Sequence, residues 1–225
     1  LRAMEHCGKW TSEVVSLVER VATRVKQNHG HNYQLESIVG VMSVEVPGDA
    51  ARLAARVIST PTETQPESKD RHNSPLESRD GWYDLEEIAK AAPAVFLNEI
   101  TPWLVATAQE FHNGYNGSTL AHYVGSCWSL DDRDYHPKTP IITAIQTCVD
   151  IVSKENPENF VSLFRRHWQS ENAIVHRIFI NGLMNIVSEC TDDVFDYLMS
   201  DDRRFTVGQY GDTQESQSVQ LITQL

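Results

Sequence analysis

The sequence lacks most of the patterns that mark membrane proteins and disulfide-stabilised proteins. Its four cysteines (Cys7, Cys127, Cys148 and Cys190) are widely spaced and form no CxxC pair, which disfavours a disulfide framework or a structural zinc site. No run of about 18 apolar residues is present, so no transmembrane helix is expected. No charged–apolar–small pattern opens the chain, so no secretory signal is expected. We therefore expect a reduced, cytoplasmic setting.

The motifs of nucleotide binding and hydrolysis are also missing. Neither GxxxxGK(S/T) nor GxGxxG occurs, so no phosphate-cradling loop is expected, and GxSxG and HExxH are absent too. The net charge is −12, and the isoelectric point is near 5.1. An acidic surface repels nucleic-acid phosphates and anionic lipids, so we expect neither nucleic acid nor a membrane as partner. The sequence predicts a non-enzymatic protein without a cofactor.

The C-terminal half does contain an internal repeat. Thr139–Gln169 aligns with Ile174–Arg204 at a constant offset of 35 residues and without a gap. The matched positions are mostly apolar and follow helical spacing, as Phe160 does with Phe195. A two-helix unit that recurs at such a period is typical of an α-solenoid. We predict an all-α fold, an α-solenoid of stacked helical hairpins of the TPR or HEAT kind, with an irregular helix bundle as the alternative.

Each copy of the repeat is predicted to be two helices joined by a short turn. Pro157 cannot continue a helix but suits the first turn of the next one, so the first joint is placed at Asn156-Pro157. The second joint is placed near Cys190, where Thr191 or Asp192 can cap a new helix. The apolar face of that new helix is predicted to contain Val194, Phe195, Leu198 and Met199.

The chain divides into three predicted parts. Residues 1–59 form an N-terminal helical segment. Residues 60–80 are rich in proline and charge and poor in apolar side chains, so they are predicted to be a flexible linker or an exposed loop. Residues 81–225 form the predicted helical-repeat domain, which is interrupted by a long loop at 113–140.

Apolar residues at helical spacing predict further helices outside the repeat. In the first of them, the predicted apolar stripe consists of Val14, Leu17, Val18, Val21 and Val25. Pro47–Asp49 is predicted to be a turn, and Pro102 is predicted to kink or restart the helix that contains it. The predicted ranges are Trp10–Asn28, Tyr33–Val46, Ala50–Ser59 and Trp82–Phe111, the last with a joint at Ala92-Pro93. A short strand at Val41–Val46 is the alternative for the end of the second range.

The long loop at 113–140 is the predicted contact surface. Loops of this length are uncommon in compact domains unless they bind something or are disordered, and the aromatic content argues against disorder. Aromatic and arginine side chains dominate interface energetics. The residues predicted to contact a protein partner are Tyr123, Trp128, Arg133 and Tyr135. Packing of the aromatics over hairpin ends is the alternative interpretation.

A cluster of acidic residues with a histidine lies in the same loop, at Asp131–His136. Such a cluster can hold a divalent cation or act as acid and base, but it lacks the alternating oxygen ligands and the glycine of a calcium loop. We therefore predict no metal site and no catalytic residue. A small metal-dependent enzyme domain built on Asp131–His136 is the second hypothesis, and a purely structural spacer is the third.

Several polar residues in the repeat have a simpler structural interpretation. Arg165–His167 and Arg203-Arg204 are predicted to be solvated helix ends, which complement the negative end of the helix dipole. Cys148 and Cys190 lie on apolar faces and are predicted to be small core residues. His176 is predicted to be a core or edge histidine with its hydrogen bonds satisfied.

The stretch VHRIFINGLMNIVSECTDDVFDYLMSDDRRFTVG (Val175–Gly208) resembles the C-terminal helical-repeat regions of large bacterial STAND-type NTPases, including those of antiviral defence. The resemblance covers about the last 90 residues. In that family the NTPase and effector domains lie elsewhere in the chain, so the resemblance implies a sensor or scaffold role, and no catalytic residue is carried over. The start at Leu1 and the apolar pattern up to Leu225 predict a piece of a larger polypeptide, with a homo-oligomer as a further possibility.

Overall fold

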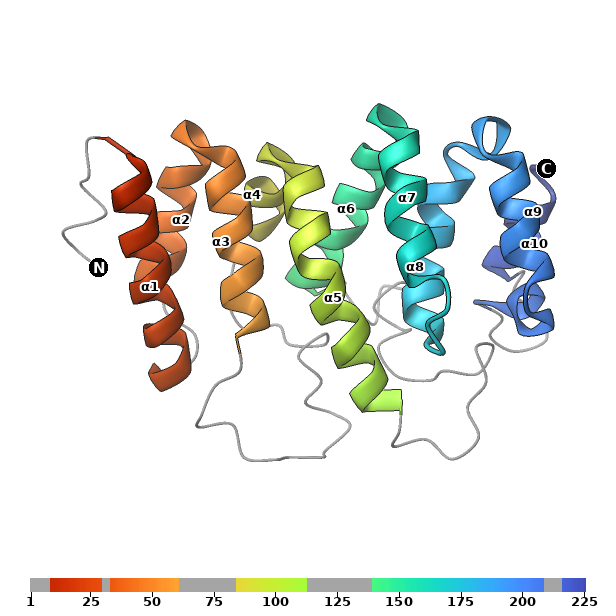
Figure 1. Cartoon of the computed structure of the whole chain (residues 1–225), viewed down its shortest axis with the longest axis horizontal. Coiled ribbons are helices and arrows are strands. Elements are labelled where there is room, and N and C mark those ends of the chain that lie inside the picture. Colours follow the sequence, from red (N-terminus) through yellow and green to blue (C-terminus); the bar gives the residue numbers. More distant parts are fainter. Residues whose placement is uncertain (1–8, 30–32, 61–83, 113–138, 209–215) are drawn as a thin grey trace.

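The computed structural model describes residues 9–29, 33–60, 84–112, 139–208 and 216–225. Within this part of the chain the α-helices, labelled in Figure 1, are α1 (Ser12–His29), α2 (Tyr33–Glu45), α3 (Pro47–Ser59), α4 (Leu85–Ala91), α5 (Pro93–His112), α6 (Pro140–Glu155), α7 (Pro157–His167), α8 (Ala173–Met184), α9 (Thr191–Met199) and α10 (Gln217–Ile222). Two short 3-10 helices, η4 (Val187–Glu189) and η5 (Asp202–Thr206), flank α9.

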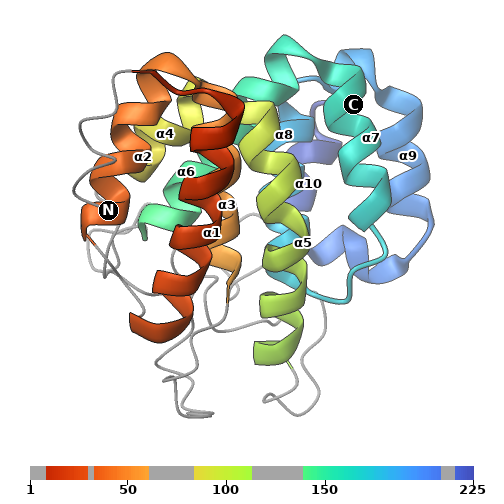
Figure 2. The ribbon, with the colours of Figure 1, turned by 60° about the vertical axis from the view of Figure 1, so that its left-hand side comes forward.

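The helices lie side by side in two layers, with α1, α3, α5, α7 and α9 in one layer and α2, α4, α6, α8 and α10 in the other (Figures 1 and 2). Helices that follow one another in the chain pack across the layers, as α2 does with α3 and α6 with α7. Each layer is also held by contacts between next-but-one neighbours, such as α3 with α5, α4 with α6, α6 with α8 and α8 with α10.

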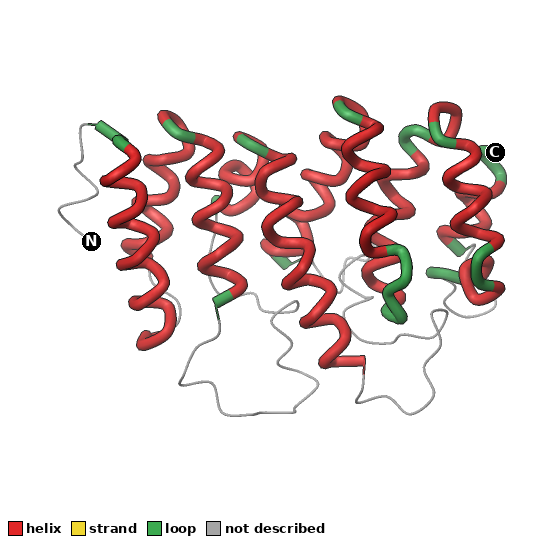
Figure 3. Tube along the Cα trace, in the orientation of Figure 1, coloured by secondary structure: helices red, strands yellow, loops and turns green. Residues whose placement is uncertain are grey.

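All regular elements of the described residues are helices (Figure 3). This confirms the predicted all-α class for that part of the chain. None of these helices combines the length and the apolarity that a membrane span requires. The predicted linker at 60–80, apart from Thr60, and the predicted loop at 113–140, apart from Thr139 and Pro140, lie outside the described residues.

Proline sets the start of several helices, because its missing N–H is not needed in the first helical turn. Pro140 and Pro157 open α6 and α7. The side chain of Asn156 caps α7 by accepting a hydrogen bond from the Asn159 amide at 3.1 Å, so the predicted joint at Asn156-Pro157 is confirmed. By the same rule Pro47 opens α3, so the prediction of a separate turn at Pro47–Asp49 is wrong: these residues form the first turn of the helix.

The second joint differs from the prediction. Cys190 occupies the N-cap position of α9 and offers no side-chain hydrogen bond there. The Thr191 hydroxyl points back instead and donates to the Val187 carbonyl oxygen at 2.9 Å. The predicted cap by Thr191 or Asp192 is therefore wrong. Of the two effects predicted for Pro102, a restart does not occur, because α5 continues through it.

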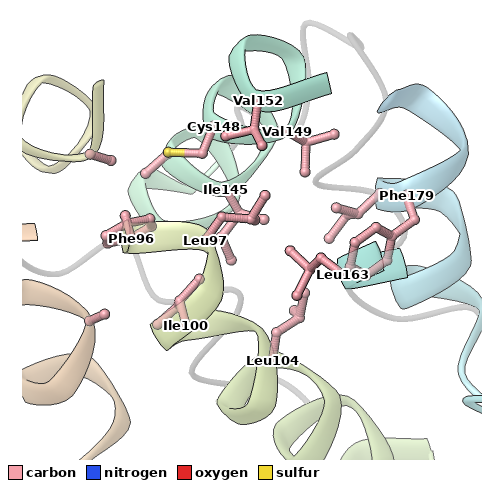
Figure 4. Packing of buried hydrophobic residues seen from close by; sticks show 14 of the residues in the cluster. Phe96, Leu97, Ile100, Leu104, Ile145, Cys148, Val149, Val152, Leu163 and Phe179 are labelled. Carbon is pink, nitrogen blue, oxygen red and sulfur yellow. The ribbon is translucent and has the colours of Figure 1, made fainter. Parts of the chain in front are cut away.

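The core runs between the two layers without interruption over the described helices. Figure 4 shows its central part, where Leu97 and Ile100 of α5 face Ile145 and Cys148 of α6, with Leu163 of α7 close by. All of these side chains are buried. Burial of a large aliphatic side chain contributes about 1.5–3 kcal/mol, so this layered core supplies most of the stability of the fold.

The predicted apolar faces are partly wrong in two helices. On α9, Val194 and Leu198 are buried as predicted, but Phe195 and Met199 are 57% and 61% exposed, and Tyr197 is buried in their place. The reason is that no helix of the described residues covers that side of α9, since α10 packs against α8 and η5. In α1, Val18 is buried and Val14 packs against the core as predicted, but Val15 and Ala22 are the other buried residues and the predicted Leu17 is 43% exposed.

Candidate functional site

The residues predicted from the sequence to bind a partner lie outside the described residues. These are Tyr123, Trp128, Arg133 and Tyr135. The acidic cluster at Asp131–His136 lies outside them as well. Both the predicted contact loop and the alternative metal-dependent site stay predictions. The candidate site is therefore sought among the helices.

Within residues 9–29, 33–60, 84–112, 139–208 and 216–225, no group of three or more histidine, cysteine or acidic side chains is arranged to hold a metal ion. Cys148 and Cys190 are buried and free of disulfides, as predicted for small core residues. Burial raises the pKa of Cys148 to about 12 and that of Cys190 to about 11, so both thiols stay protonated near neutral pH. A protonated thiol is a poor nucleophile, which disfavours thiol catalysis at either residue.

His176 of α8 is buried with both ring nitrogens paired. Its Nε2 lies 2.6 Å from the Ser170 carbonyl oxygen, and its Nδ1 lies 2.8 Å from the Tyr197 hydroxyl. A carbonyl oxygen only accepts, so Nε2 carries the proton and Nδ1 accepts from Tyr197. Burial lowers the pKa of His176 to about 4, which keeps the ring neutral. The prediction of a satisfied core histidine is confirmed.

Arg204 of η5 completes this buried polar cluster. Its guanidinium group donates to the carbonyl oxygens of Tyr197 at 2.7 Å and Trp168 at 2.8 Å, and its carbon lies 4.6 Å from the centroid of the Tyr197 ring. Arg204 is only 3% exposed, so the prediction that Arg203-Arg204 is wholly solvated is wrong for Arg204. Two helix-end carbonyls and an aromatic face take the place of water around its guanidinium group. The cluster joins α7, α8 and α9, and its hydrogen bonds hold that junction together.

A surface groove of about 620 Å³ separates α7 from the η4–α9 turn. Its volume falls within the range of about 300–1,000 Å³ that is usual for ligand sites. Two helical hairpins contribute its walls, so the groove exists only because the hairpins stack side by side. Glu158, Val161, Ser162, Arg165 and Arg166 line it from α7, and Glu189, Cys190 and Asp193 line it from the opposite wall.

The groove carries charges of both signs. Arg165 Nε donates to Asp193 Oδ1 at 2.5 Å and so links the two walls. Arg166 donates to the Asn98 side-chain oxygen of α5 at 3.0 Å, which holds its guanidinium at the edge of the groove. Glu158 and Glu189 make no ion pair with any described residue. These two carboxylates are available to basic groups of a ligand.

Sequence reasoning did not find this groove. Arg165–His167 was expected to be a solvated helix end, and Arg165 is indeed exposed. Its pairing with Asp193, 28 residues later in the chain, depends on how the hairpins stack. The repeat offset indicated that two hairpins follow one another, but it carries no information about the space between them.

Comparisons of this chain with models of protein families, with curated proteins and with solved structures find no match. No family is assigned on that basis. The fold and the groove therefore carry the functional argument.

Proposed function

We propose that this protein is a non-enzymatic recognition module, an α-solenoid of TPR- or HEAT-like helical hairpins, that binds a polypeptide segment in the groove between α7 and α9. The packing of next-but-one helices within each layer supports the solenoid, because stacked hairpins make such contacts. The groove is the observation that carries the proposal. It is formed between hairpins, reaches the surface and presents two carboxylates without ion-pair partners in the described chain.

The electrostatics favour a polypeptide that carries basic side chains. Glu158 and Glu189 can pair with lysine or arginine of the ligand, and the Arg165–Asp193 pair presents further polar groups between them. The overall net charge of −12 acts in the same direction, since it attracts basic segments and repels nucleic acids. The predicted contact loop, with Tyr123, Trp128, Arg133 and Tyr135, would supply a second contact surface for the same partner.

The resemblance of Val175–Gly208 to the repeat regions of STAND-type NTPases supports a sensor or scaffold role within a larger bacterial defence protein. In that setting the ligand is a foreign protein, and its binding gates an NTPase elsewhere in the polypeptide. The groove lies within the segment that carries the resemblance and the hairpin before it.

A blocking substitution tests the groove directly. Ser162 is an exposed residue of α7 that lines the groove, so Ser162→Trp fills it without disturbing the core. Ser37→Trp is the matched control, because Ser37 is an exposed residue of α2 near the other end of the row of helices (Figure 1). Peptides are first selected from a random-sequence phage library on the unmodified protein, and their dissociation constants are then measured for all three proteins.

We expect the selected peptides to share basic residues and Ser162→Trp to weaken their binding by at least about tenfold, which corresponds to about 1.4 kcal/mol. Ser37→Trp should leave binding unchanged. Equal affinities of the selected peptides for both variants, or a selection that yields no related sequences, would overturn the proposal.

A further inference from the structure

One ion pair bridges the two walls of the groove between α7 and the η4–α9 turn. Arg165 belongs to the last turn of α7 and Asp193 to the first turn of α9, and both line the groove. Arg165 donates from Nε to Oδ1 of Asp193 at 2.5 Å, and its Nη2 contacts the same oxygen. A polypeptide segment that fills the groove therefore meets this pair.

The two partners of the pair differ in exposure. The Asp193 side chain is 17% exposed, whereas the Arg165 side chain is 58% exposed. A short, mostly covered carboxylate has few alternative positions, but a long and exposed arginine side chain loses rotamer freedom when it is held in one place. Asp193 is therefore the fixed partner, and Arg165 is the partner that can leave.

Arg165 engages only one of the two carboxylate oxygens. A guanidinium binds a carboxylate most strongly when two parallel N–H groups donate to the two different oxygens. Here both contacting nitrogens of Arg165 approach Oδ1, and in the part of the chain that the structure describes Oδ2 of Asp193 accepts no hydrogen bond. An arginine of a ligand is not tied to α7 and is free to adopt the geometry that uses both oxygens.

The wall of the groove stays acidic when Arg165 leaves. The first turn of α9 favours the Asp193 carboxylate through the helix dipole, and the last turn of α7 favours a displaced Arg165 in the same way. Burial and the charges of Asp193 and Glu189 raise the pKa of the Cys190 thiol to about 11, so both carboxylates lie near it on one wall. Ion pairs with an exposed partner contribute little to stability, so a ligand can break this one.

We propose that Asp193 recognises an arginine of the polypeptide bound in the groove, and that Arg165 occupies the place of that arginine in the free protein and is displaced on binding. The inference rests on the proposed function of the groove and adds its specificity and its regulation. Arg165 is an autoinhibitory contact, because the ligand must first break a pair within the protein. Arginine rather than lysine is the expected residue, since only a guanidinium can engage both oxygens at once.

The test measures binding of labelled hexa-arginine and hexa-lysine peptides by fluorescence anisotropy. Arg165→Gln removes the competing side chain. Arg166→Gln is the matched control, because it makes the same change of charge at the next residue of the groove, but Arg166 donates to Asn98 and not to Asp193. Arg165→Gln/Asp193→Asn removes both partners, and Ser162→Trp blocks the groove. A melting curve is recorded for each variant.

We expect Arg165→Gln to bind hexa-arginine about fivefold more tightly than the unmodified protein, which corresponds to the upper end, about 1 kcal/mol, of the contribution of exposed ion pairs. Arg166→Gln should change the affinity by less than about twofold, because a charge that does not cover Asp193 is screened by salt. Arg165→Gln/Asp193→Asn should bind at least about tenfold more weakly than Arg165→Gln, because a charge-assisted hydrogen bond is lost. Arg165→Gln should prefer hexa-arginine to hexa-lysine.

The outcomes separate this inference from the proposed function. If Ser162→Trp bound hexa-arginine as tightly as the unmodified protein, the groove would not be the binding site, and the proposed function would fail together with the inference. If Ser162→Trp weakened binding but Arg165→Gln gained no more than Arg166→Gln, only the displacement of Arg165 would be refuted.

Two further results would also overturn the inference. Weaker binding to Arg165→Gln than to the unmodified protein would show that Arg165 contacts the ligand instead of competing with it. Equal affinities of Arg165→Gln for hexa-arginine and hexa-lysine would remove the preference for arginine. If the double variant did not fold, the comparison of Arg165→Gln with Arg166→Gln would still decide.

Discussion

Gly182 lies where α6, α7 and α8 meet, and its replacement by alanine tests how closely the hairpins are packed. A Cβ atom at this position would meet the tip of the Phe160 ring of α7. It would also lie 2.8 Å from Phe160 Cε2 and 2.7 Å from Val149 Cγ1 of α6. Neither neighbour can retreat easily, because Phe160 and Val149 are themselves buried in the core. Only glycine fits at this contact between hairpins.

The expected cost follows from two opposing effects. Overpacking in a filled core costs about 1–3 kcal/mol, whereas alanine is favoured over glycine inside a helix by about 1 kcal/mol. Gly40 of α2 offers the matched control, since a Cβ atom there meets nothing within 4 Å. Gly40→Ala should therefore stabilise the protein through helix propensity alone. Gly182→Ala should lose up to about 2 kcal/mol, which lowers the melting temperature by up to about 8 °C for a chain of this size.

Thermal unfolding followed by circular dichroism measures both variants beside the unmodified protein. The double variant Val149→Ala/Gly182→Ala should lose less stability than the two single variants lose in sum. The reason is that Val149→Ala removes one of the two side chains that clash with the new Cβ atom. If Gly182→Ala melted at or above the temperature of Gly40→Ala, the close packing of α6, α7 and α8 described here would be refuted.

Three further predictions concern the buried polar cluster and the contact loop. Tyr197→Phe leaves Nδ1 of His176 without its hydrogen-bond donor and should lower the free energy of unfolding, measured by chemical denaturation, by about 1–3 kcal/mol. An unchanged free energy of unfolding would show that the two groups do not meet. The pKa of His176 is about 4 in the folded protein against 6.5 when exposed, so the unfolded chain binds more protons between these values and stability should fall as the pH is lowered from 6.5 towards 4. His167, whose pKa is also lowered, acts in the same direction, so the melting temperature of His176→Gln is compared over the same pH range and should fall less steeply; parallel curves would contradict the assignment. Trp128→Ala should weaken partner binding at an unchanged melting temperature, whereas a large drop in that temperature would mark Trp128 as a core residue.

Local rules predicted the helix boundaries that depend on local chemistry. Pro157 indicated where α7 begins, because proline fits a first helical turn whatever the rest of the chain does. The burial of individual side chains was less predictable. Phe195 has the same residue type and the same place in the repeat as Phe160, yet one is exposed and the other buried. The difference lies in how the two helices are rotated, because α9 buries Val194, Tyr197 and Leu198, which stand one position out of step with the buried Phe160, Leu163 and Phe164 of α7.

Arg204 illustrates the same limit for a charged residue. From the sequence, an arginine beside another arginine at a helix end is expected to be solvated. Its burial depends on the carbonyl groups of Trp168 and Tyr197, which tertiary packing brings to it. The groove was hidden for the same reason, since the approach of Arg165 to Asp193 follows from the stacking of two hairpins.

The proposed role depends on ligand contact at the groove between α7 and α9, and hydrogen exchange tests that contact most directly. Amide exchange is compared for the protein alone and for the protein saturated with a peptide selected from the random library. The account predicts slower exchange in α7 and in the η4–α9 turn, and no change in α1–α3. Protection confined to α1–α3, or no protection at saturation, would contradict it.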